Sequence, residues 1–102
     1  MKEIVDILSK EKIICKKLDE VAFKTKKRVK IYFGINIKNE YCLIVKIYKK
    51  SRFLRKDIPF LEEIEKSFDN KFKSKRKILI LNEICSKAKK ELKEWRVIDG
   101  VS

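Results

Sequence analysis

The chain has 102 residues, enough to bury one hydrophobic core and too few for two independent ones. Apolar residues make up 44% of the chain and charged residues 42%, which excludes a disordered polymer, and no apolar stretch approaches the roughly 20 residues of a membrane-spanning helix. The formal net charge of +13 favours polyanionic partners. We predict a single domain over residues 1–102 and no membrane partner.

The beginning of the sequence and the cysteines indicate the cellular compartment. Glu3 and Asp6 interrupt the first apolar residues and no small-residue cleavage site follows, so we expect no secretory signal and a cytoplasmic location. Cys15, Cys42 and Cys85 are an odd number of cysteines without CxxC spacing. We predict that they are reduced and mostly buried rather than redox-active or metal-ligating. Dense mixed charge with few amide residues is also typical of proteins from heat-adapted cells.

The first predicted elements are a helix and a short strand. Apolar residues form a broad stripe between charged positions over 3–12, which predicts an opening helix. Ile13, Ile14, Cys15 and Leu18 then predict a short strand that leads toward Asp19 and Glu20, although a helix that continues through these residues is an alternative.

Two strands joined by a tight turn follow. Apolar residues alternate strictly with other residues over 29–37, which predicts a half-buried strand. Residues 38–40 suit a hairpin turn, and 41–48 has apolar residues on both faces, which indicates a more central strand. A three-residue turn pairs odd with odd positions. One face of the hairpin then combines cations with aromatic rings, and its residues are Lys30, Tyr32, Asn36, Ile44, Lys46 and Tyr48.

The second half of the chain begins with a helix and a buried strand. Residues 49–56 form a basic connection, after which Asp57 as N-cap and Pro59 in the first turn predict a helix that ends near residue 70. A basic linker over 71–77 follows, and the apolar run 78–81 predicts a strand covered on both faces.

The last two elements complete a mixed sheet. Asn82 is the predicted N-cap of a helix whose apolar stripe ends near Trp95, and 96–99 predicts a short final strand. The order α-β-β-β-α-β-α-β favours right-handed crossovers and parallel pairing beside the antiparallel hairpin. We therefore predict an α/β fold with one mixed β-sheet flanked by helices.

The positive charge is concentrated in the first half of the chain. Residues 1–56 hold 17 basic and 6 acidic residues, a net charge of +11, whereas residues 57–102 hold 11 and 9, a net charge of +2. A solvated lysine-rich surface is one interpretation, but the regional excess favours a phosphate-binding face. Eleven of the 17 basic residues of the first half gather in two runs: Lys24, Lys26, Lys27, Arg28 and Lys30, then Lys46, Lys49, Lys50, Arg52, Arg55 and Lys56.

The order of elements and two regions resemble the restriction-endonuclease-like, or PD-(D/E)xK, nuclease superfamily. The first region is 27–31 (KRVKI) followed by 41–46 (YCLIVK). The second is 77–81 (KILIL) with 86–90 (SKAKK) and the ending 95–99 (WRVID), which is similar to the strand, helix and strand after that family's core helix. The resemblance covers nearly the whole chain and implies a fold, while function depends on the site itself.

The resemblance also indicates what is missing. The family's chemistry needs two carboxylates that hold a divalent cation and a lysine near the attacking water. Here the first acidic position falls on Lys30 and the second on Ile44, so the motif keeps only Lys46. Neither side chain ligates magnesium, which implies a degenerate site. A relocated metal site built from Asp19, Glu20 and Glu40 remains an alternative.

Other catalytic chemistry lacks its residues. The chain has no histidine, which removes Ser-His and Cys-His relays and histidine metal ligands. Neither GxGxxG nor GxxxxGK occurs, and the serines lack a nucleophile-elbow motif. We predict no cofactor, no bound metal and no catalytic residues.

The leading hypothesis is a non-catalytic nucleic-acid-binding domain that uses a basic sheet face and the adjoining loop. Cations contact phosphates and the two tyrosine rings stack on bases or sugars. The predicted contact residues are Lys27, Arg28, Lys30, Tyr32, Lys46, Tyr48, Lys49, Lys50, Arg52, Arg55 and Lys56.

Two alternatives stay open. The first is a protein-interaction or homodimerisation domain derived from a degenerate nuclease fold, with Phe53, Phe72 and Trp95 as exposed anchors and a homo-oligomer as the assembly. The second is a nuclease with an unorthodox site, recognised by metal-dependent cleavage.

Overall fold

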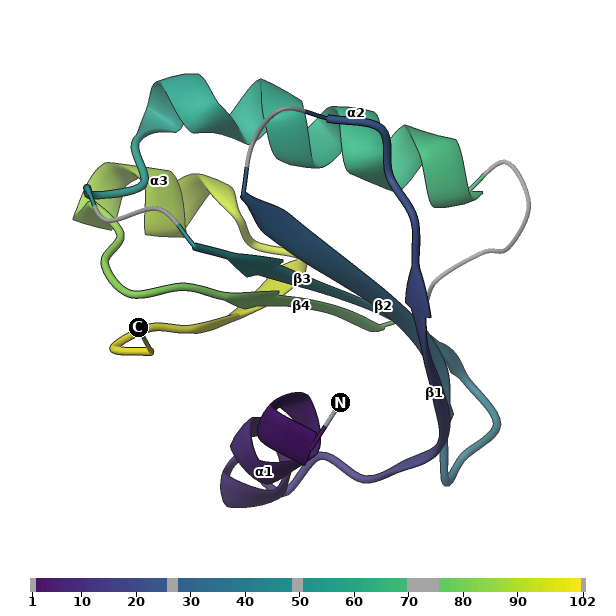
Figure 1. Ribbon diagram of the computed structural model, residues 1–102. Coiled ribbons are helices and arrows are strands. Elements are labelled where there is room, and N and C mark those ends of the chain that lie inside the picture. Colours follow the sequence, from purple (N-terminus) through teal and green to yellow (C-terminus); the bar gives the residue numbers. More distant parts are fainter. Residues whose placement is uncertain (1, 26–27, 49–50, 70–75, 102) are drawn as a thin grey trace.

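A mixed β-sheet lies between two helical layers. The computed structural model describes residues 2–25, 28–48, 51–69 and 76–101. Within them, α2 and α3 cover one face of a five-stranded sheet and α1 covers the other (Figure 1). The elements are α1 (Lys2–Lys10), β1 (Cys15–Val21), β2 (Val29–Asn36), β3 (Tyr41–Ile47), the 3₁₀-helix η1 (Arg55–Asp57), α2 (Ile58–Asp69), β4 (Arg76–Ile80), α3 (Ser86–Glu91) and β5 (Trp95–Ile98).

The strands lie in sequence order, and their directions match the predicted mixed sheet. β1, β2 and β3 form an antiparallel meander, and β4 and β5 continue it in parallel after the helical crossovers α2 and α3. The hairpin register pairs Ile31 with Val45 and Phe33 with Leu43. The predicted pairing of odd with odd positions is therefore confirmed, and with it the division of hairpin side chains between the two faces.

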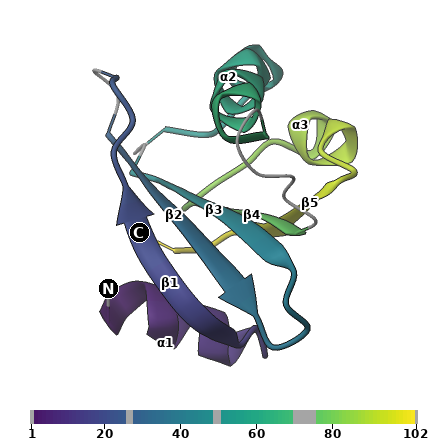
Figure 2. The same ribbon diagram turned by 90° about the vertical axis from the view of Figure 1, so that its right-hand side faces the viewer.

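Each face of the sheet has its own hydrophobic core. Figure 2 shows the helices on the two opposite sides of the sheet. Beneath α2 and α3, buried residues such as Leu43, Val45 and Leu79 pack against Leu61 and Ile64. On the other face, apolar side chains of α1 pack on the strands in what we call the α1 core: Ile4, Leu8, Tyr32, Ile44, Ile78, Ile80 and Ile98. Both faces of β3 and β4 are covered, which explains their continuous apolar runs.

The start of the last helix differs from the sequence prediction. Ile84 forms a parallel β-bridge with Phe53, and Cys85 N–H donates to the Phe53 carbonyl at 3.0 Å. This pairing keeps the chain extended past Asn82, the predicted cap. Cys85 is the N-cap instead, and its Sγ accepts a hydrogen bond from Ala88 N–H at 3.3 Å. The helix is consequently shorter than predicted.

Other boundaries shift by a few residues. β1 begins at Cys15, two residues after the predicted start at Ile13, and ends at Val21, just past Asp19 and Glu20, toward which the predicted strand leads. Pro59 lies in the first turn of α2, as predicted. Asp57 directly precedes α2, and its carboxylate accepts a hydrogen bond from Leu54 N–H at 2.9 Å, which caps the start of η1. No helix among the described residues has the length and apolar character needed to cross a bilayer.

Candidate nucleic-acid interface

The hairpin places the predicted cations and rings on one face, as the alternation indicated. Lys30 pairs with Lys46 and Tyr32 pairs with Ile44 across β2 and β3, and Tyr48 N–H donates to the Arg28 carbonyl at 3.0 Å just beyond the ladder. This is the face that α1 covers, so the helix decides which of these side chains reach solvent.

Lys46 is buried beneath α1. Its side chain is 1% exposed, and its Nζ donates a hydrogen bond to Glu3 Oε1 on α1. The same ammonium lies 4.7 Å from the ring centroid of Tyr48, within the range of a cation–π interaction. The hydrogen bond from Lys46 and its positive charge together lower the pKa of the Glu3 carboxyl below its usual value. The expected surface exposure of Lys46 is therefore wrong.

Tyr32 is also covered by the helix. Its side chain is 2% exposed and belongs to the α1 core. Burial is the main cause that raises the pKa of its hydroxyl to about 12, with a smaller contribution from the charge of Glu20, its cross-strand partner. The prediction that its ring is available for stacking is wrong, because apolar residues of α1 occupy the place of a base.

Two other residues of this face, Lys30 and Tyr48, line an open hollow. Its walls are Glu3, Arg28, Val29, Lys30 and Tyr48, and its volume is about 500 Å³. Arg28 and Lys30 are exposed and Tyr48 is half-buried. The structure therefore brings together three predicted residues at the surface, with the Lys46 ammonium against the Tyr48 ring. We call this site the basic hollow.

The other predicted cations lie elsewhere or outside the described residues. Arg52 donates to Glu83 Oε1 through Nε at 3.0 Å and Nη2 at 2.8 Å, and Arg55 Nη2 lies 2.8 Å from Glu91 Oε1. These two arginines and the exposed Lys56 do not line the basic hollow. Lys27, Lys49 and Lys50 lie outside the described residues.

The positions that the resemblance assigns to metal-binding acids carry other side chains. The cross-strand partner of Lys30 is Lys46, while Ile44 lies opposite Tyr32 and is fully buried. Two carboxylates are needed to share one ion, yet the first acidic position carries an ammonium and the second a buried apolar side chain. Within the described ranges, no three His, Cys, Asp or Glu residues gather where they could hold a metal ion.

The three acids considered for a relocated metal site are separated by the fold. Asp19 and Glu20 are successive residues of β1, so their side chains point to opposite faces of the sheet. Glu40 lies at the far end of the hairpin, where its Oε1 accepts hydrogen bonds from Asn36 Nδ2 at 3.1 Å and Arg76 Nε at 3.5 Å.

The apolar residues considered as interaction anchors are not presented at the surface. Phe53 is 1% exposed inside the α2 and α3 core, and Trp95 is half-buried against the same core. Phe72 lies outside the described residues. All three cysteines are free thiols, and Cys42 is the buried one, whereas Cys15 and Cys85 are half-buried.

Sequence reasoning missed Glu3 as the partner of Lys46. The two residues are far apart in the chain, and their contact depends on how α1 docks on the sheet. The one local signal is that Glu3 lies next to Ile4, a residue of the apolar stripe.

The order of elements and the mixed sheet match the restriction-endonuclease-like fold that the sequence predicts. Three solved structures are similar to this chain. EndoMS in apo form matches with a TM-score of 0.60 and 13% identity, over 99% of this chain and 47% of that one. An EndoMS–dsDNA complex matches with a TM-score of 0.54 and 16% identity, over 99% of this chain and 45% of that one, and a repair endonuclease from Pyrococcus abyssi matches with a TM-score of 0.56 and 16% identity, over 97% of this chain and 46% of that one. The chain thus spans about half the length of each. No family model and no curated protein sequence matches it. The likeness confirms the predicted fold.

Proposed function

We propose that the chain is a nucleic-acid-binding domain that retains a nuclease fold and holds a phosphate backbone at the basic hollow without cleaving it. The observation that supports this most directly is that Lys30, which stands where the resemblance expects the first metal-binding acid, pairs across the hairpin with Lys46, the lysine that the motif keeps. A lysine ammonium carries the positive charge that a metal ion otherwise supplies to a phosphate, but it has no bound water to activate.

Because Lys46 is buried, its role in the proposal is electrostatic and not a direct contact with phosphate. Its ammonium is fixed between the Glu3 carboxylate and the Tyr48 ring, so it raises the local potential without losing side-chain entropy on binding. Arg28 and Lys30 are exposed on the same hollow and are the direct phosphate contacts. The half-buried Tyr48 ring is the surface for a sugar or base.

Duplex DNA is the first probe to choose, because one of the similar structures is a complex of EndoMS with dsDNA. Binding to a short labelled duplex with 5′-hydroxyl ends is measured by fluorescence anisotropy across a salt series. The double variant Arg28→Gln/Lys30→Gln should reduce affinity about tenfold at low salt and lower the slope of log K against log salt by about 2, since each phosphate contact contributes about 0.9 to that slope.

The matched control is Lys87→Gln/Lys90→Gln, which removes the same charge from exposed positions of α3. This control variant should keep most of the wild-type affinity for the duplex. Equal losses in the two variants would show that only net charge matters and would contradict a site at the basic hollow. Incubation of closed circular DNA with Mg²⁺ or Mn²⁺ tests the absence of cleavage. Nicking that Lys46→Met abolishes would contradict the non-catalytic part of the proposal.

A further inference from the structure

A second basic hollow lies at the opposite end of the strands. It is bounded by the loop after α1, by the turn between β2 and β3, and by the first residues of β3, β4 and β5, with a volume of about 350 Å³. The basic hollow described above lies where β2 begins and β3 ends, whereas this one lies where β2 ends and β3 begins. We call it the turn pocket. Its ligand does not depend on the proposed function.

The cations of the turn pocket are only partly neutralised. Arg76 Nε lies 3.5 Å from Glu40 Oε1, and the one acidic residue in the described lining, Glu94, lies 3.7 Å from Lys77 Nζ. Arg96 Nη2 donates to the Glu11 backbone carbonyl at 3.1 Å and has no ion pair with a residue that the structure describes. Lys12 and Lys38 also line the pocket, and neither ammonium has an ion pair with any residue that the structure describes. This concentration of positive charge favours an anion.

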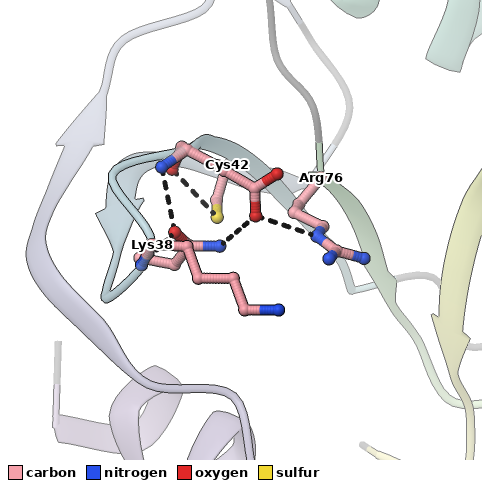
Figure 3. Close-up of polar contacts among 5 residues, drawn as sticks. Lys38, Cys42 and Arg76 are labelled. Atoms are coloured by element: carbon pink, nitrogen blue, oxygen red, sulfur yellow. Dashed lines mark hydrogen bonds and ion pairs between the residues drawn. The ribbon is translucent and has the colours of Figure 1, made fainter.

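The wall that carries Lys38 is held rigidly. Asn36 Oδ1 accepts hydrogen bonds from the backbone N–H groups of Lys38 and Glu40, both at 2.9 Å, and Asn36 Nδ2 donates to Glu40 Oε1 at 3.1 Å. The same carboxylate oxygen contacts Arg76, so one network links the turn to the start of β4 (Figure 3). Figure 3 shows the Lys38 and Arg76 side chains extending from this network toward the same side. The network thus holds the backbone of Lys38 and the guanidinium of Arg76 in place before a ligand arrives.

The turn pocket also has an unusual apolar side. Ile14 and Ile37 are 60% and 58% exposed, more than any other large hydrophobic residue in the described part of the chain, and both line this pocket. Ile13 and Ile78 line it as well. An inorganic anion cannot bury this apolar surface, whereas an anion with an apolar or aromatic group binds more favourably because that group covers the surface.

We propose that the turn pocket binds the phosphate monoester of one nucleotide, with the phosphate among Lys12, Lys38, Arg76 and Arg96 and the base against Ile14 and Ile37. The volume lies at the lower end of small-ligand sites and suits one nucleotide rather than several. The same chemistry is offered by a free nucleoside monophosphate and by the 5′-phosphorylated end of a strand.

Isothermal titration with adenosine monophosphate, adenosine and inorganic phosphate tests the proposal. Adenosine monophosphate should bind saturably and more tightly than either of the other two. The variant Lys12→Asn/Lys38→Gln should weaken it at least tenfold, and asparagine suits position 12 because that residue has φ 60°. The control Lys87→Gln/Lys90→Gln should leave it within about twofold, as expected for surface changes away from the site.

Strand ends are distinguished with one oligonucleotide that carries either a 5′-phosphate or a 5′-hydroxyl. If the phosphorylated form binds more tightly and this difference is lost in Lys12→Asn/Lys38→Gln, the ligand is the end of a strand. If the two forms bind equally, the ligand is the free nucleotide. Equal affinity for adenosine and adenosine monophosphate, or no effect of the variant, overturns the proposal. The hydroxyl-ended duplex used for the basic hollow has no phosphate monoester, so the two proposals can fail independently.

Discussion

At the scale of single residues, Lys46 shows how a charge is accommodated under a helix. A buried ammonium without a partner is strongly unfavourable, and it is tolerated here because Glu3 supplies a carboxylate at the rim of the covered region. Because the Glu3 side chain is 62% exposed, solvent weakens the pair on one side. Of the two residues, Glu3 is therefore the one whose protonation and environment respond to solvent, whereas Lys46 is held by the residues that bury it.

Removal of the Glu3 carboxylate should destabilise the protein in a pH-dependent way. The pKa of Glu3 is lowered in the folded state, so its stabilising contribution is present above the ordinary carboxyl value of 4.5 and is lost as the pH falls through the lowered value. Glu3→Gln should therefore unfold at lower urea concentration than the wild type at pH 7, and the two should converge at acidic pH.

The double variant Glu3→Gln/Lys46→Met serves as the control for this prediction. It removes both charges, so it should regain most of the stability that Glu3→Gln loses. Identical urea midpoints for the wild type and Glu3→Gln at pH 7 would show that Lys46 does not need this partner.

At the scale of the elements, β1 approaches β2 very closely at Gly34. A Cβ atom at this position would lie 2.5 Å from the Lys17 carbonyl oxygen and 3.0 Å from Leu18 Cδ1. The register of β1 and β2 shifts between Cys15 and Lys17, next to this contact. The alternating pattern of β2 placed Gly34 on the face with the cations and rings, but no rule of alternation indicates that only a glycine fits there.

Gly34→Ala should lower the free energy of unfolding by about 1–3 kcal/mol, the usual cost of forcing an extra carbon into a packed site. Chemical denaturation followed by circular dichroism measures this difference. Gly100→Asn is the control, because Gly100 has φ 77°, a Cβ atom added there would meet nothing within 4 Å, and asparagine tolerates that conformation. Its effect should stay below about 0.5 kcal/mol. An unchanged stability of Gly34→Ala would mean that β1 can move away from β2.

At the scale of the whole molecule, the sheet joins two cores that lie on opposite faces. The core beneath α2 and α3 is the larger, and the α1 core depends on one short helix. Both cores use alternate residues of β3 and β4, such as Val45 and Ile44. Loss of either layer exposes one side of the same strands, which couples the two layers into one cooperative unit.

Leu8→Ala tests this coupling. Leu8 is 2% exposed in the α1 core, so its truncation should cost about 2–5 kcal/mol. Trp95 packs on the opposite core, and its fluorescence should report the same lowered midpoint as far-ultraviolet circular dichroism. Val5→Ala, at a residue that is 48% exposed, should change stability by less than about 0.5 kcal/mol. Two separate transitions in Leu8→Ala would contradict a single unit.

The sequence predicted the sheet better than it predicted what covers the sheet. Strict alternation in β2 was enough to divide the hairpin residues correctly between two faces, because the period of a strand is local. The docking of α1 over Tyr32 and Lys46 depends on contacts between residues far apart in the sequence, which no local pattern predicts. The cations of the turn pocket were missed for the same reason, since Lys12, Lys38, Arg76 and Arg96 come from four separate segments.

The position of α1 also has a consequence for synthesis on the ribosome. The helix precedes every strand in the chain, but the residues it covers include Ile78, Ile80 and Ile98. A nascent chain that has made the hairpin still lacks the parallel strands against which Ile4 and Leu8 pack. Because contacts so distant in sequence form late, we expect the amphipathic helix to remain undocked while the rest of the chain is synthesised. We expect the ammonium of Lys46 to stay accessible to water until the helix docks over it.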